Sequence, residues 1–521
     1  MRNKHVKETT ERVIACIDLG TNSARLLIVQ LYANFSYRIL RQHKITVRLG
    51  EGEFVSGYLT DAAMDRAIVA CRGFYEIALS FGAVEVIGYA TSATRDAKNR
   101  EVFLERLLKE TGIDFDVISG NEEARLIWLG ITSSTEIIEN SVLFIDIGGG
   151  STEIIVGDQH GYSFLYSLHL GSIRTTTQFF SNPKGSIPQS ELKALRKHIV
   201  GEVASVSSEI KQYAPTIAIG SSGTVINLEK VASKIETTHQ QGILTRKELK
   251  ALYLLLAGLS YSERCAIPGI NKERCDIIVA GARILYEVMK ACNIREIKVT
   301  EFGLRDGMLA DYLARCPEFL ERGDLSVRDV SIHQLAQIFC VDLAHASHVS
   351  DLTAQMFDSA HASGLISYDT RWRELLLYAS YVHDVGQFIA HFRHQLHSEY
   401  IVSNAGLLGF SEYEILLLSL FCRYHRKRIP RERDIGYSSL STEDKRAVFI
   451  LSFILRCAEA LDRSHDGRVK TAVLSRPNER KIQLQVTATQ DCTIEMWAVE
   501  EEISLLENTF AYEVNIVCTT Q

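Results

Sequence analysis

Two copies of one turn specify the architecture of this chain: Asp18-Leu19-Gly20-Thr21-Asn22-Ser23 and Asp146-Ile147-Gly148-Gly149-Gly150-Ser151. Each follows a short apolar run, over residues 13–17 or 142–145, and each leads into a second apolar run. Glycine permits the tight backbone of a hairpin, so both stretches predict a strand, a turn and a returning strand. A repeat of this kind indicates two related lobes.

The pattern continues in parallel after each hairpin. A third strand is expected over residues 37–48 in one copy and 162–169 in the other, followed by alternating helices and strands. That order predicts two α/β lobes, over residues 1–135 and 136–318, each with a mixed sheet covered by helices. We expect the two turns to face a shared cleft.

The second half of the chain has a different periodicity. Apolar residues recur at helical spacing over residues 331–358, 372–389, 412–424 and 442–460. An all-helical domain is therefore expected over residues 319–466. Short alternating runs then predict strands over 470–474, 481–486, 493–499 and 512–518, with a short helix around Ile503. These form an expected small α+β domain over residues 467–521.

Composition limits the classes of function. The 521 residues exceed what one core supports, and neither a signal peptide nor an apolar run of the ~20 residues that cross a bilayer is visible. We therefore expect a cytoplasmic protein without a membrane span. The 11 cysteines form no C-x-x-C pair, so we expect reduced thiols. The net charge of -7 disfavours nucleic acid as a partner and requires local groups to hold any polyanion.

The duplicated turns suit phosphate binding. Glycines let the backbone approach closely, amides and hydroxyls donate hydrogen bonds, and the aspartate can hold hydrated Mg²⁺. A tight hairpin without a ligand is the alternative for one turn, and the second copy weakens it. A third glycine-rich turn, Gly220-Ser221-Ser222-Gly223-Thr224, lies between a predicted strand and helix, where amides at the helix start favour an anion.

Six motifs carry a specific family resemblance. They are DLGTNSARLLIV (18–29), GYATSATRDAKN (88–99), ISGNEEARLIWLG (118–130), FIDIGGGSTEIIVG (144–157), IAIGSSGT (217–224) and FGLRDGML (302–309). In this order they resemble the signature motifs of the exopolyphosphatase/guanosine pentaphosphate phosphohydrolase (Ppx/GppA) family. One departure is Asp306, where the family more often has Glu.

The resemblance implies fold and activity together. It implies ribonuclease H-like lobes of the actin, sugar-kinase and heat-shock-ATPase class. It also implies Mg²⁺-dependent (or Mn²⁺-dependent) release of terminal phosphate from inorganic polyphosphate, by a homodimer. Guanosine pentaphosphate is the alternative substrate. Further alternatives are a kinase, for which no sugar-pocket Asp motif is found, and a non-catalytic polyphosphate-binding sensor.

The resemblance also implies roles for individual residues. Glu123 is the expected catalytic carboxylate, although a first-turn acid that complements the helix dipole is the alternative, which suits Glu122. Arg95 is expected to grip phosphate, with a salt bridge as the alternative. The expected metal ligands are Asp146, Glu153 and Asp18. The expected phosphate cradle comprises Thr21, Asn22, Ser23, Gly148, Gly149, Gly150, Ser151, Gly220, Ser221, Gly223 and Thr224.

The helical half holds a series of histidines and aspartates. His345, His383, Asp384, His397, His425 and Asp462 occur in the order seen in HD-type metal phosphohydrolases. They could bind one or two divalent metals and activate water, which would make the helical half a metal phosphohydrolase. The favoured interpretation is an HD-like scaffold for polyphosphate binding and dimerisation. The basic run 423–428 either guides polyphosphate or is a solvated face.

Overall fold

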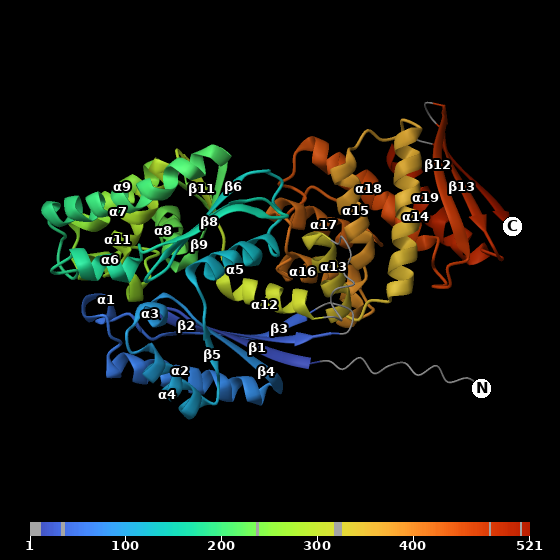
Figure 1. The fold of residues 1–521 in the computed structure, drawn as a ribbon. Coiled ribbons are helices and arrows are strands. Elements are labelled where there is room, and N and C mark those ends of the chain that lie inside the picture. Colours follow the sequence, from blue (N-terminus) through green and yellow to red (C-terminus); the bar gives the residue numbers. More distant parts are fainter. Residues whose placement is uncertain are drawn as a thin grey trace. The chain divides into compact units, whose positions relative to one another are not determined.

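Figure 1 shows the computed structural model, which describes residues 12–32, 37–235, 239–316, 326–478, 481–510 and 513–520. The chain divides into two compact units, residues 1–323 and 324–521. The expected boundary at 318/319 lies outside the described residues. The division into four domains stays a prediction.

The first lobe is built on a five-stranded sheet with the order β3-β2-β1-β4-β5. Its elements are β1 (Arg12–Leu19), β2 (Ser23–Leu31), β3 (Tyr37–Thr46), α1 (Glu53–Ser56), α2 (Asp61–Ser80), β4 (Ala83–Ala90), α3 (Ser92–Asp96), α4 (Arg100–Thr111), β5 (Phe115–Val117) and α5 (Gly120–Thr132). In Figure 1, α2 and α4 lie along one face of this sheet.

The second lobe has a six-stranded sheet with the order β10-β11-β9-β6-β7-β8. Its elements are β6 (Val142–Ile147), β7 (Thr152–Gly157), β8 (Tyr162–Leu168), α6 (Ser172–Phe179), α7 (Gln189–Ile210), β9 (Ile217–Ser221), α8 (Ser222–Ile235), β10 (Ile243–Thr245), α9 (Arg246–Gly258), α10 (Tyr261–Ala266), α11 (Ile278–Ala291), β11 (Glu296–Val299) and α12 (Leu304–Arg315).

The two sheets repeat one topology. β1 pairs antiparallel with β2 and parallel with β4, and β6 pairs antiparallel with β7 and parallel with β9. Each hairpin turn is closed by the same hydrogen bond, from Gly20 N to Ser23 O at 3.1 Å and from Gly148 N to Ser151 O at 2.9 Å. The predicted pair of duplicated α/β lobes is confirmed.

The central strands are apolar because both of their faces are covered. Successive side chains of a strand point to opposite faces. On β1, Ala15 and Ile17 pack with Phe74 of α2, whereas Ile14 and Cys16 pack with Met308 of α12. The first sheet is therefore enclosed between α2 and α12.

Helix α12 packs directly against α5 through glycines. A Cβ atom at Gly307 would lie 1.8 Å from the carbonyl oxygen of Leu126, and one at Gly130 would lie 2.1 Å from that of Gly303. Asp306 accepts a hydrogen bond from Gly303 N at 2.9 Å, which caps the start of α12. The FGLRDGML motif thus positions α5.

Among its described residues, the second unit has six α-helices before its sheet and one within it. Its elements are α13 (Val327–Ile338), α14 (Leu343–Ala362), α15 (Thr370–Val382), α16 (His394–Asn404), α17 (Glu412–Tyr424), α18 (Thr442–Ala460), β12 (Val469–Asn478), β13 (Lys481–Ala488), α19 (Thr493–Phe510) and β14 (Glu513–Thr520). The three strands have the order β12-β13-β14, and one hydrophobic core joins the helices to β12 and β13.

One expectation for this unit was wrong. The helical spacing over 331–358 corresponds to two helices, α13 and α14, separated near Cys340, whose φ is 51°. The strand expected over 493–499 lies within α19. There Glu495, Val499 and Ile503 are buried at a spacing of four, which is a helical face. Because β13 and β14 are parallel, they require such a crossover.

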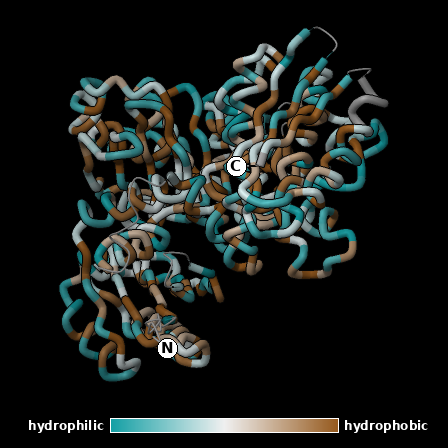
Figure 2. Tube along the Cα trace, turned by 90° about the vertical axis from the view of Figure 1, so that its right-hand side faces the viewer, coloured by the Kyte–Doolittle hydropathy of each residue, from teal (hydrophilic) through white to brown (hydrophobic). Residues whose placement is uncertain are grey.

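Hydrophobic stretches are short and alternate with hydrophilic ones along the chain (Figure 2). No helix among the described residues is long and apolar enough to span a bilayer. All 11 cysteines are free thiols.

Candidate active site

The two duplicated turns line one pocket of the first unit. The pocket also receives the start of α8, the first turn of α5 and the segment before α12. The turns touch each other, since a Cβ atom at Gly150 would lie 2.9 Å from Thr21 Oγ1 and 2.4 Å from Ser92 Oγ. Of the predicted residues, the pocket is lined by Asp18, Thr21, Asn22, Ser23, Glu123, Asp146, Gly148, Gly149, Gly150, Ser151 and Gly223.

Four carboxyl groups gather at this pocket. Asp18, Glu123, Asp146 and Glu153 are all buried or nearly so, and burial raises the pKa of each. Asp18 reaches a pKa of about 6, with Arg25 opposing the rise, and Glu123 reaches a pKa of about 7. Their mutual repulsion adds to the rise, so these groups compete for protons or for a cation.

Asp146 stands at the end of β6, directly before its turn. Ser221 donates a hydrogen bond from Oγ to Asp146 Oδ2. Glu153 is the register partner of Asp146 on β7 and is 1% exposed. Ser167 Oγ donates to Glu153 Oε1 at 2.8 Å. Glu153 therefore lies behind Asp146, away from the open pocket.

Glu123 projects from the first turn of α5. Ser119 caps this helix, because its side chain accepts a hydrogen bond from Glu122 N. Arg95 Nη1 lies 3.1 Å from Glu123 Oε2, and this ion pair opposes the effect of burial on the pKa of Glu123. Glu122 pairs instead with Arg125 at 2.7 Å. Of the two neighbouring glutamates, Glu123 therefore lines the pocket and Glu122 does not.

Arg95 is bound by protein groups. Its Nη1 atom also donates to the carbonyl of Ile118 at 2.8 Å. It is not among the residues that line the pocket. Arg95 therefore forms the salt bridge with a helix acid that was the alternative expectation. Asp96 pairs with Arg174 instead. A direct phosphate contact of Arg95 stays a prediction.

Arg25, Arg274 and Glu301 line the pocket but were not singled out from the sequence. Arg25 is the register partner of Asp18 on β2. Arg274 Nη1 donates to Thr224 Oγ1 at 3.2 Å, and burial, followed by the charge of Arg25, lowers its pKa to about 10. Neither guanidinium forms an ion pair with a described residue. Arg25 lies in the DLGTNSARL motif, whereas Arg274 lies outside every motif.

Three residues of the third turn take supporting positions. A Cβ atom at Gly220 would lie 2.7 Å from Ile297, so this glycine serves strand packing. Thr224 Oγ1 donates to the carbonyl of Ile147 at 3.2 Å, and Ser221 holds Asp146. These residues connect the third turn to the second.

The carboxyl groups suit a magnesium ion. Among the four, only Glu123 forms an ion pair with a described residue, so three buried carboxyls need protons or a cation. Oxygen donors of this kind are the ligands that Mg²⁺ prefers. Asp18 and Asp146 face the pocket, and Glu153 stands behind.

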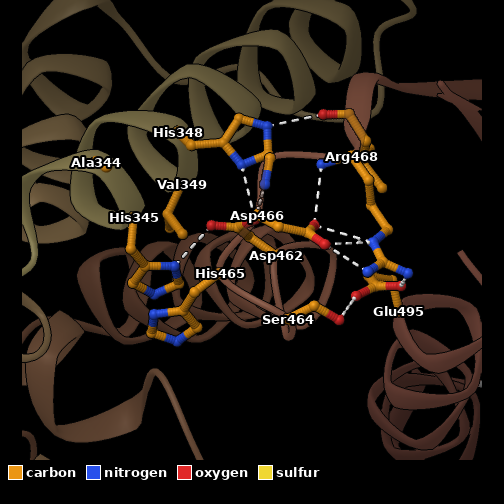
Figure 3. Close-up of polar contacts among 12 residues, drawn as sticks. Ala344, His345, His348, Val349, Asp462, Ser464, His465, Asp466, Arg468 and Glu495 are labelled. Carbon is orange, nitrogen blue, oxygen red and sulfur yellow. Dashed lines mark hydrogen bonds and ion pairs between the residues drawn. The ribbon is translucent and has the colours of Figure 1, made fainter. Parts of the chain in front are cut away.

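The helical unit brings together most of the residues predicted for its site, but one histidine differs from the prediction. His345, His383, Asp384 and His425 lie in one buried cluster, and the histidine of α16 that joins them is His394 instead of His397. Both histidines lie on α16, three residues apart, so spacing alone could not choose between them. Asp462 Oδ2 lies 2.7 Å from His345 Nδ1 (Figure 3), at the edge of the cluster.

The basic run is partly neutralised. Arg423 pairs with Glu399, and Tyr424 is buried with its hydroxyl on Asp434 Oδ2 at 2.8 Å. Guidance of polyphosphate by the rest of this run stays a prediction.

Comparisons with known proteins identify the family of this chain. Residues 27–316 match the family model described as the Ppx/GppA phosphatase family, and residues 327–507 match domain III of the Ppx/GppA phosphatases. Exopolyphosphatase 1 of Mycobacterium tuberculosis is 29% identical over 301 residues, which cover 57% of this chain and 87% of that protein.

A crystal structure of an exopolyphosphatase from Cytophaga hutchinsonii is also similar. Its TM-score is 0.55 at 28% identity, and the match covers 59% of this chain and 99% of that one. The two family models together reach from the first lobe into α19. The chain is a phosphoanhydride hydrolase and belongs to the Ppx/GppA phosphatase family.

Proposed function

We propose that the protein releases terminal orthophosphate from linear inorganic polyphosphate by Mg²⁺-assisted hydrolysis in the pocket between the two lobes. The observation that carries this proposal is that one pocket holds both cationic groups, which can bind a phosphate, and a buried carboxyl group, which can accept a proton. Arg25 and Arg274 form no ion pair with a described residue, and they share the pocket with the buried carboxyl of Glu123. The exopolyphosphatase names of the relatives support the choice of substrate.

The turns and arginines bind the anion. The Gly20 and Gly148 turns line the pocket together with Thr21 and Ser151. Backbone amides and hydroxyls of such turns can donate hydrogen bonds to phosphate oxygens. Unpaired guanidinium groups add charge-assisted hydrogen bonds. The terminal phosphate is therefore held between the two lobes.

Glu123 accepts a proton from the attacking water. A pKa of about 7 places this carboxyl where a general base is most effective near neutral pH. The ion pair with Arg95 fixes its direction. Asp146, with Asp18 and Glu153, would hold Mg²⁺, which supplies positive charge against the phosphate oxygens.

Guanosine pentaphosphate is the alternative substrate, because the same pocket chemistry would accept its 5′ terminal phosphate. Phosphate release from long-chain polyphosphate and from guanosine pentaphosphate should be measured with Mg²⁺ for the wild type, Glu123→Gln and Glu122→Gln. We expect Glu123→Gln to lose ~10²–10⁴-fold in turnover while still binding polyphosphate. Glu122→Gln is the matched control and should retain turnover.

Two results of these activity measurements would contradict the proposal. Faster turnover of guanosine pentaphosphate by the wild type would replace the proposed substrate and keep the site. Near-normal turnover in Glu123→Gln, together with inactivity of His383→Ala, would move the active site to the helical unit. Homodimer formation and cytoplasmic location stay predictions.

A further inference from the structure

The helical unit holds a second cluster of ligand-type side chains, separate from the pocket of the lobes. It comprises two overlapping groups, His345/His383/Asp384 and Asp384/His394/His425, and within each group the potential ligand atoms all lie within 4.8 Å of one another. All five residues are buried, at 0–9% exposure. They come from α14, from the end of α15, from α16 and from the end of α17.

Each histidine presents the same ring nitrogen to the centre of this cluster. The Nδ1 atoms of His383, His394 and His425 lie 2.6–3.0 Å from the backbone carbonyl three residues earlier in the chain. His345 Nδ1 instead lies 2.7 Å from Asp462 Oδ2. Acceptors at all four Nδ1 atoms place the protons there and leave the Nε2 lone pairs inward, which is how metal-binding histidines are oriented.

Figure 3 shows how Asp462 positions the first histidine. One carboxylate oxygen contacts His345, and the other lies 3.0 Å from His348 Nδ1 and accepts from Gly467 N at 3.0 Å. The His345 ring also stacks on His465 at 3.7 Å between ring centroids. Asp462 is therefore a positioning residue for His345, with both of its oxygens engaged by protein groups.

The Nε2 atoms and Asp384 crowd one small space. His394 Nε2 lies 3.1 Å from His425 Nε2 and 3.1 Å from Asp384 Oδ1. His425 Nε2 lies 3.6 Å from Asp384 Oδ1, and His383 Nε2 lies 3.7 Å from Asp384 Oδ2. Ligands at ~2.0–2.2 Å from a shared metal are separated by roughly 3–3.5 Å, so these spacings suit coordination.

Hydrogen bonding within the protein does not account for the cluster. A proton on His394 Nε2 could serve Asp384 or His425. His345 Nε2 and His383 Nε2 would still be buried without a hydrogen-bond partner among the described residues. Buried polar groups in this state are costly, and a cation among the lone pairs satisfies all of them together.

We infer that the helical unit binds two divalent transition-metal ions, bridged by Asp384, with His345 and His383 on one ion and His394 and His425 on the other. Imidazole ligands suit Zn²⁺, Fe²⁺, Ni²⁺ or Cu²⁺, whereas Mg²⁺ suits carboxylates and water. The site therefore differs in ion class from the carboxylate pocket of the lobes. The inference does not depend on the proposed polyphosphatase activity.

Metal content tests the inference directly. Tag-free full-length protein is stripped with a chelator, loaded with Zn²⁺ alone, passed through a desalting column and analysed by elemental mass spectrometry. We expect about two retained ions per chain for the wild type and about one for His425→Gln, as a two-metal site requires. His397→Ala, three residues from His394 on the same helix, is the matched control and should retain both.

A spectroscopic signal separates ligation from folding. With Co²⁺, the wild type should show visible absorption bands that His383→Gln and His345→Gln weaken or lose, while circular dichroism confirms that each variant is folded. Asp146→Asn should leave the bands unchanged. No retained ion in the wild type, or the same content and bands in the wild type and folded His383→Gln, would overturn the inference.

Discussion

The phosphate pocket and the histidine cluster show two ways of gathering charge in one chain. In the pocket, turns between adjacent strands supply amides and carboxylates, with Arg25 and Arg274 beside them. In the cluster, several helices each contribute an imidazole or carboxylate to a closed centre. Turns leave backbone donors open to an anion, whereas helices expose only side chains, so the first arrangement suits a phosphate and the second suits a metal ion.

The strongest effects should come from two variants, each of which impairs one of the two sites. Asp146→Asn should lower Mg²⁺-dependent phosphate release by ~10²–10³-fold, because charge stabilisation at the phosphate is lost. Asp384→Asn should instead remove most of the retained transition metal. Initial rates and metal content are measured on both variants. Equal loss of metal content in both would break the distinction between the two sites.

A smaller effect is expected from the arginines of the pocket. Arg25→Gln and Arg274→Gln should each raise the KM for polyphosphate ~10–100-fold, since a charge-assisted hydrogen bond contributes ~1.5–3 kcal/mol. The effect should shrink as salt rises. Arg106→Gln is the control, because Arg106 lies outside the pocket in an exposed pair with Asp65. Unchanged KM in both pocket variants would exclude them from anion binding.

The glycine contact between α5 and α12 should matter mainly for stability. Gly307→Ala places a methyl group against the Leu126 carbonyl and should lower the free energy of unfolding by ~1–3 kcal/mol. Gly73→Ala in α2 is the control, since a Cβ atom there meets nothing within 4 Å. Chemical denaturation measures both. If Gly307→Ala unfolds like the wild type, the close packing of these helices is not what positions Glu123.

The smallest expected effect is a dependence of stability on pH. Burial raises the pKa of Glu123 to about 7, above its ordinary value of 4.5, so the folded protein binds the extra proton and loses stability as pH rises. Between pH 6 and pH 8 this amounts to roughly 1 kcal/mol for the metal-free protein. The charges that face Glu123 are Arg95, Asp18, Asp146 and Glu153.

The contribution of Glu123 is separated from that of every other titratable group by comparing the wild type with Glu123→Gln. The difference in melting temperature between them should change between pH 6 and pH 8 without Mg²⁺ and should diminish with Mg²⁺ present. A difference that does not vary with pH would mean that Glu123 is already ionised in the empty pocket.

Local sequence was enough to predict the lobes and their turns. Each turn is six consecutive residues between two apolar runs, and its hydrogen bond joins residues only three apart. Family motifs then predicted an enzyme of the right family. The strand expected over 493–499 was wrong, because the apolar residues Ile494 and Trp497 are exposed there while Glu495 is buried.

Features that depend on neighbouring residues along the chain could be predicted without coordinates: the duplicated hairpins, the apolar strands and the family. Contacts between residues far apart in the chain required the folded structure. Arg274 reaches the pocket from outside every motif, Arg95 is held by Glu123, and His394 takes the place expected for His397. These contacts depend on how helices and sheets pack against each other. The hydrophobic effect that drives this packing is non-directional, so a pattern of apolar residues does not show which polar side chains will meet.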